Sequence, residues 1–341
     1  MPSVHTCCYS AWVKKTILLC AGVLITAGGL VFAYGSRPET KESPELPVLL
    51  SLASDPIPDL HPHEHTERDT VDSIGHGVPF HAHEVVTTED LWVRGVRITI
   101  KNAPRVTLHH LNVLVFPAVS AADAAGAFPQ FNAPYGISVG QDISDTLLLS
   151  KPYATYIPKD SRIVLSGMMH NPEPPKGPGG DYADVSVSVD LLGIDFPKAE
   201  AKRVQPLFLS LIDRESPYQD SFEVPAHSAH FTRFTDTPED VGRATYVFPT
   251  DGMLVELGAH LHAWEGGEKV DAYLNGKVIH TFTPRHAGTE PWDFATDRTT
   301  LMLRVKKGDV LSLSATYSNE HDEPLLGAMG ILGGSFAPDI R

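Results

Sequence analysis

The chain has 341 residues, of which 42% are hydrophobic and 20% are charged, and its formal net charge is -15. This composition is close to the globular average, which argues against a disordered chain and against a protein with many membrane spans. The acidic balance argues against nucleic acid as a partner, because a phosphate-binding surface needs an excess of Lys and Arg. The length predicts about two domains.

Residues 1–35 carry an uninterrupted apolar stretch from Ile17 to Tyr34, directly after Lys14 and Lys15. A stretch of about 18 apolar residues predicts a transmembrane helix. Because the cations stay on the cytoplasmic side, the rest of the chain is expected on the periplasmic or extracellular side, anchored to the membrane. A cleaved signal peptide is the alternative, and it would give a secreted protein.

Residues 36–83 are rich in Pro, Glu, Asp and His and show no sustained period, which predicts a stalk. Several histidines of this stretch stand two residues apart, as in His61, His63 and His65. They are interpreted either as solvated side chains or as weak metal ligands.

After Glu84 the sequence changes to short alternating runs broken by Gly, Pro, Asn and Asp, which is typical of β-sandwiches. We expect an all-β protein with an N-terminal sandwich domain over residues 84–202 and a C-terminal one over residues 203–341. The stretch from Phe196 to Asp220 shows no clean alternation. Asn275-Gly276 predicts a tight hairpin, because both central positions of the preferred turn need positive φ. The expected strands cover residues 91–93, 96–100, 106–116, 162–169, 185–192, 221–224, 230–235, 245–248, 254–262, 270–274, 277–282, 301–305 and 310–317.

His260 and His262 are two residues apart at the end of a predicted strand. Such residues project from the same face, about 6.6 Å apart along the strand. Two imidazoles can then converge on one metal ion, and Gly258 before the pair and Gly266-Gly267 after it leave backbone room for a site. The alternative is a pair of polar residues on an exposed strand face.

His109 and His110 are adjacent, and adjacent residues of a regular strand point to opposite faces. Both can bind one metal only at a bulge, a bend or a strand end; otherwise one buried and one exposed histidine is expected. His170 follows the predicted strand from Ile163 to Met169 and precedes Asn171-Pro172, which places its imidazole at a strand end.

The three cysteines, Cys7, Cys8 and Cys20, all lie in the N-terminal segment, so a metal site further along must use His, Met or carboxylates. Met168, Met169 and Met329 are candidate thioether ligands, although a single Met is more often a core residue. Imidazole combined with thioether favours copper.

Taken together, these motifs resemble the type II copper monooxygenases, the group of peptidylglycine α-hydroxylating and dopamine β-monooxygenases, over residues 84–336. The resemblance implies two jelly-roll-like antiparallel domains that hold up to two copper ions across a solvent-filled cleft. Met168 stands where the family usually has a histidine, and Met329 is shifted from the usual methionine. The implied metal ligands are His109, His110 and His170 for one copper and His260, His262 and Met329 for the other.

The resemblance also implies hydroxylation of a small organic substrate with O2 and ascorbate. Two alternatives stay open at this point. The first is a copper-holding or copper-delivery protein without monooxygenase chemistry, and the second is a metal-free β-sandwich that binds a partner or glycan.

Overall fold

The computed structural model describes residues 45–60, 78–81, 84–117, 135–140, 146–169, 171, 181–211, 222–234, 244–262, 266–286, 294–295 and 298–339. The predicted membrane helix lies outside these residues. Within them, no helix has the length and apolar character needed to span a membrane. Residues 46–341 form one compact unit.

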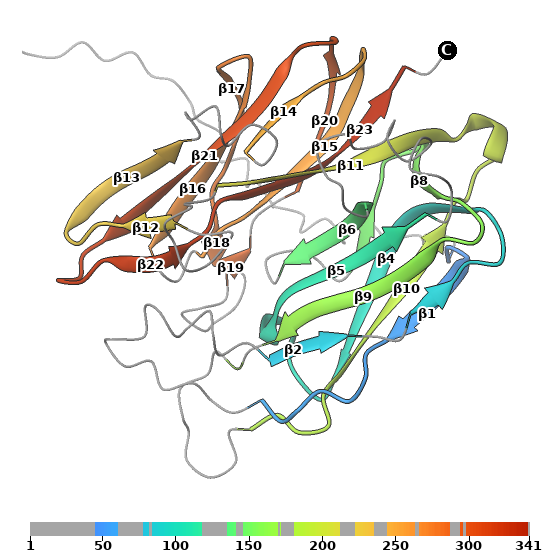
Figure 1. Cartoon of the computed structure of the whole chain (residues 1–341), viewed down its shortest axis with the longest axis horizontal. Coiled ribbons are helices and arrows are strands. Elements are labelled where there is room, and N and C mark those ends of the chain that lie inside the picture. The colour runs from blue at the N-terminus through green and yellow to red at the C-terminus, as the bar shows by residue number, and fades with distance from the viewer. Residues whose placement is uncertain are drawn as a thin grey trace, which may run out of the picture. The chain divides into compact units, whose positions relative to one another are not determined.

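The described part of the chain is all-β, as expected, and its helical turns are two short 3-10 segments, Arg105–Thr107 and Lys198–Glu200. Figure 1 shows the strands and their layers. The largest sheet has nine strands in the order β1 (Val48–Ala53), β10 (Ser186–Gly193), β4 (Leu91–Lys101), β8 (Tyr153–Ile157), β11 (Lys202–Ser210), β23 (Ile331–Pro338), β15 (Gly252–His260) and β20 (Thr299–Val305), with β7 (Thr146–Leu148) beside β4.

Two five-stranded sheets and two short strand pairs make up the rest of the described structure. One sheet has the order β2 (Val78–His81), β9 (Arg162–Met169), β5 (Leu108–Phe116) and β6 (Tyr135–Gly140), with β3 (Val85–Val86) beside β9. The other has the order β13 (Ser228–Phe234), β21 (Val310–Asn319), β16 (Gly267–Leu274) and β17 (Lys277–Phe282), with β14 (Thr245–Val247) beside β21. The pairs are β12 (Phe222–Val224) with β22 (Leu325–Ala328), and β18 (Arg285–His286) with β19 (Phe294–Ala295).

Each five-stranded sheet packs on one half of the large sheet and encloses its own hydrophobic core. In the first core, alternate residues of β5 such as Leu111 and Val113 meet residues of β4 and β10 such as Val93 and Val189. The second core is built in the same way from β15, β16, β21 and β23, with Tyr317 and Phe336 among its largest buried side chains. The period of two in the sequence therefore reflects strands with one face buried and one face more open.

Strand β11 connects the two halves. It pairs in parallel with β8 through Lys202 to Val204 and in antiparallel fashion with β23 through Gln205 to Ser210. The large sheet thus runs without interruption from one core to the other. The boundary predicted near Lys202 falls at the first residue of this connecting strand. A small apolar cluster lies at the junction, composed of Leu149, Tyr153, Val204, Val255 and Ala337.

Two stretches differ from the sequence-based expectation. The stalk predicted for residues 36–83 is wrong for Val48–Ala53, which pairs with β10 and buries Leu52, and for Val78–His81, which pairs with β9. The stretch without clean alternation contains β11, where Pro206 lies opposite Ser335. Tertiary pairing overrides the weak local pattern in both places. The predicted hairpin is confirmed, with φ of 51° at Asn275 and 75° at Gly276 between β16 and β17.

Candidate metal centre

His109 lies at a β-bulge. In the pairing of β5 with β9, Leu108 is opposite Met169 and His110 is opposite Met168, so His109 is the extra residue of β5. A bulge places two residues against one and re-aims their side chains. The ring centroids of His109 and His110 are 5.2 Å apart. The bulge is the irregularity that adjacent histidines need if both are to face one region.

His260 and His262 are held by neighbouring strands on the other half of the large sheet. His260 is the last residue of β15 and pairs with Ile331 of β23. Two residues further on, the backbone N–H of His262 donates to the hydroxyl of Tyr317 at 2.9 Å, and the His262 carbonyl accepts from the N–H of Gly267 at 3.1 Å. The backbone N–H and the backbone carbonyl of His262 are therefore both anchored to the second half of the structure.

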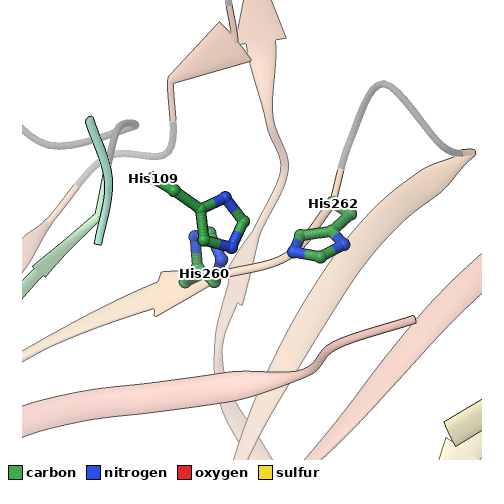
Figure 2. Close-up of side chains that lie close together, drawn as sticks. All are labelled: His109, His260 and His262. Atoms are coloured by element: carbon green, nitrogen blue, oxygen red, sulfur yellow. The ribbon is translucent and has the colours of Figure 1, made fainter. Parts of the chain in front are cut away.

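The three imidazoles of His109, His260 and His262 form one cluster, which Figure 2 shows with the rings facing one another. The His109 ring lies 5.7 Å from that of His260 and 5.2 Å from that of His262, and the last two are 5.5 Å apart. One nitrogen from each ring lies within 4.8 Å of the other two. All three side chains are buried, with exposed fractions of 5%, 9% and 1%.

The dimensions of this histidine cluster fit a single metal ion after a small contraction. Nitrogens bound to a tetrahedral metal at 2.0–2.1 Å are about 3.4 Å apart. Starting from separations of at most 4.8 Å, each nitrogen has to move inward by less than about 1 Å. Rotation about the side-chain bonds supplies such a shift, so the residues present fit an imidazole-bound metal.

The cluster groups the candidate ligands differently from the sequence-based interpretation. His109 was expected with His110 and His170 in a site of its own, yet it lies with His260 and His262. His170 is outside the described residues. Spacing along the chain identifies residues that share a strand. It does not tell which strands of the first half lie next to which strands of the second half.

His110 lies beside the cluster and is half-buried. Burial lowers the pKa of its imidazole to about 4, and the nearby His260 and His262 add to this effect. Its cross-strand partner is Met168. Directly opposed residues share one face of a sheet with Cβ atoms about 5 Å apart, so the Met168 thioether lies on the same face as the His110 ring.

Met329 is connected to His262 through the hydroxyl of Tyr317. This hydroxyl accepts from the Met329 N–H at 3.2 Å and donates to the Met329 carbonyl at 2.6 Å, while it also accepts from the His262 N–H. The main chain at Met329 and at His262 is thus held by one atom. This role of Tyr317 could not be predicted from the sequence, because a buried aromatic residue in an alternating strand has the signature of a core residue.

A buried carboxylate was also missed by the sequence analysis. Glu256 is 3% exposed, lies on the same strand as His260, and contacts Arg298 and Ser335. Burial raises the pKa of its carboxyl, and Arg298 and Ser335 oppose this shift. Gly258, between Glu256 and His260, leaves space that the Arg298 side chain occupies. In the sequence, Gly258 indicated room for a metal site; in the structure, this room accommodates the Arg298 side chain of the ion pair.

Comparison with known proteins gives no family for this chain. No family model and no curated protein matches it. Among solved structures it is similar to PNGF-II, with 12% identity, a TM-score of 0.37 and coverage of 86% of this chain and 65% of that chain. It is also similar to the PBCV-1 virus capsid, with 9% identity, a TM-score of 0.31 and coverage of 88% and 97%. The chain spans 65% of the length of PNGF-II, and similarities at this level carry no functional conclusion.

Proposed function

We propose that this chain is a copper-binding protein and that His109, His260 and His262 hold one copper ion. The observation that supports this proposal is the meeting of three buried imidazoles, one from β5 and two from the end of β15 and the segment after it, with nitrogens within 4.8 Å of one another. Neutral imidazole is the commonest protein ligand of metal ions. A buried cluster of imidazoles is therefore suited to a monovalent or divalent transition metal ion.

Copper is favoured over zinc by two considerations. Nitrogen ligands bind Cu(II) more tightly than Zn(II), following the general order of divalent metals. Thioethers stabilise Cu(I), and the main chain of Met329 is fixed to that of His262, while Met168 shares a face with His110. One copper per chain is the content expected from the described residues, because three of their rings form one cluster.

Oxidation chemistry is the second part of the proposal. The cluster offers three imidazole ligands from the described residues, and a site with three protein ligands keeps a coordination position open, which is the arrangement of catalytic rather than structural metal sites. A copper ion held there would supply one-electron redox chemistry, with ascorbate as the reductant and O2 as the oxidant. Hydroxylation of a C–H bond of a small substrate would then take two electrons from ascorbate and two protons, and would release the second oxygen atom as water. The imidazoles would fix the coordination geometry and their burial would exclude bulk water. A copper-holding or copper-delivery protein is the alternative.

Export is also part of the proposal. The apolar stretch from Ile17 to Tyr34 after Lys14 and Lys15 supports a membrane anchor with the β-sandwiches on the periplasmic or extracellular side, or secretion if the segment is cleaved. Fractionation of cells that express the full chain, with protease added from outside, tests this location. Protection of the chain from protease in intact spheroplasts would contradict it.

The experiment that tests the copper proposal is elemental analysis of the full chain after incubation with equal amounts of copper and zinc and removal of loose metal. We expect about one copper and little zinc per chain. Ascorbate-dependent consumption of O2 then separates a catalyst from a carrier. Retention of zinc over copper, or of no metal, would refute the copper assignment, and copper without O2 uptake would favour the carrier.

A further inference from the structure

The hydroxyl of Tyr317 has all of its hydrogen-bonding capacity used by the main chain of two candidate ligands. A hydroxyl has one donor and two acceptor positions. Here the donor goes to the Met329 carbonyl, and the two acceptor positions receive the N–H groups of Met329 and His262, over distances of 2.6, 3.2 and 2.9 Å. The hydroxyl is therefore a fixed bridge between two separate segments.

The ring that carries this hydroxyl is itself rigidly placed. Tyr317 is fully buried, and its ring packs edge-to-face on Phe222 at 5.6 Å. Its backbone lies on β21 between Phe231 of β13 and Gly267 of β16. Because paired strands on both sides and the Phe222 ring hold Tyr317 in place, its hydroxyl provides one anchoring point for both segments.

The segment after His262 returns to the same strand. The N–H of Gly267 donates to the His262 carbonyl, and the N–H of Ser318 donates to the carbonyl of Gly266. At Gly266, where φ is +86°, an added Cβ would lie 2.0 Å from the Ser318 carbonyl oxygen. The two glycines thus allow the close approach that fixes His262 next to Tyr317.

We propose that Tyr317 is a positioning residue that sets the geometry of the copper site, by holding the backbone of His262 and of Met329 at one atom. The inference rests on the proposed copper function. It also implies that Met329 and His262 move together, so a change at the hydroxyl should alter both the affinity for copper and the arrangement of its ligands. Groups that orient metal ligands typically contribute about 10- to 100-fold to metal affinity.

Tyr317→Phe tests this inference, with Tyr246→Phe as the matched control. Tyr246 belongs to the same core and is 4% exposed, and within the described part of the chain its hydroxyl has no hydrogen-bond partner. Both variants remove one buried phenolic oxygen from the full chain. We expect Tyr317→Phe to weaken Cu(II) binding by about 10- to 100-fold and to change the copper hyperfine splitting in the electron paramagnetic resonance spectrum. Tyr246→Phe should change neither.

The outcomes separate this inference from the copper proposal. If the wild-type chain binds copper and Tyr317→Phe keeps its affinity and spectrum, the positioning role is refuted and the copper site stands. Equal losses in both variants would also refute it, because a general effect on the core would then explain the result. A wild-type chain that binds no copper would overturn both.

Amide hydrogen exchange of the wild-type chain gives a second measurement if Tyr317→Phe does not fold. Since one hydroxyl holds both amides, Cu(II) should slow the exchange of the His262 and Met329 amides together. Slower exchange at His262 with no change at Met329 would contradict the coupling.

Discussion

The ring of His109 lies 5.2 Å from the ring of His262, although His109 is on β5, which lines the first core, and His262 follows β15, which lines the second. The contact is possible because β11 continues the large sheet across the junction and because a bulge in β5 turns His109 out of the regular alternation. The candidate site is therefore a product of how the two halves join, and its integrity should depend on both.

Replacement of His109 by Ala should remove one of three ligands. Loss of a residue that only orients a metal ligand can already lower metal affinity by about 100-fold. We expect the loss of a ligand itself to lower copper affinity by more than that. His280→Ala is the control, because His280 lies on β17 with its ring against Phe282 and outside the cluster. Competition with a chelator of known copper affinity measures both. Equal affinities in the two variants would contradict a role for His109.

Gly267→Ala should disturb the site through the main chain of His262. An added Cβ would lie 2.8 Å from the His262 carbonyl oxygen and 2.9 Å from the Leu261 side chain. Overpacking of this kind costs about 1–3 kcal/mol. We expect lower stability to urea together with weaker copper binding. In Gly333→Ala, the control, the nearest atom of the described residues to the added Cβ is the Leu207 carbonyl oxygen, at 3.9 Å. Similar effects of both substitutions would argue against this mechanism.

The two cores should unfold in one transition, since one sheet runs through both. Leu165→Ala in the first core and Leu313→Ala in the second each create a cavity at a buried site and should cost about 2–5 kcal/mol. Urea unfolding followed by tryptophan fluorescence and by circular dichroism should give one coincident transition that both variants shift. Two separate transitions, each sensitive to only one variant, would show that the halves are independent.

Asp190 should make the free energy of unfolding depend on pH in the acidic range. Ser51 donates to its carboxylate and Arg97 pairs with it, and these partners hold the Asp190 pKa below its ordinary value of 3.8. A carboxyl group whose pKa is lower in the folded state than in the unfolded state stabilises the fold at pH values above its unfolded-state pKa. This stabilisation is lost as the pH falls through the folded-state pKa. Asp190→Asn should therefore cost up to about 1 kcal/mol at neutral pH and progressively less below about pH 4. A difference that stays constant down to pH 2 would contradict this linkage.

Much of the strand content could be predicted from the sequence, because the alternation that marks β5, β9 and β21 is the same alternation that builds the cores. The hairpin at Asn275-Gly276 was predictable for a local reason, the positive φ of both residues. By contrast, β1 and β11 have weak local patterns, and they are strands because β10 and β23 pair with them. Such pairing depends on distant segments and leaves little trace in a single sequence.

The candidate ligands could be found from the sequence, but their grouping could not. The spacing of His260 and His262 indicates a shared face, and the His109-His110 pair indicates an irregular strand. Which of these sets meet is decided by the junction of the two halves, and that junction depends on β11, a strand with no clear sequence pattern. The role of Tyr317 was hidden for the same reason, since only the folded structure brings Met329 to its hydroxyl.

The central claim is that His109 and His260 bind the same ion. Titration of the full chain with copper in the wild type, His109→Ala and His260→Ala, with the bound ion counted per chain, tests it most directly. We predict one tightly bound ion in the wild type and its loss in each variant. Two ions in the wild type with one retained in each variant would show two separate sites, and unchanged binding in both variants would show that the cluster holds no metal.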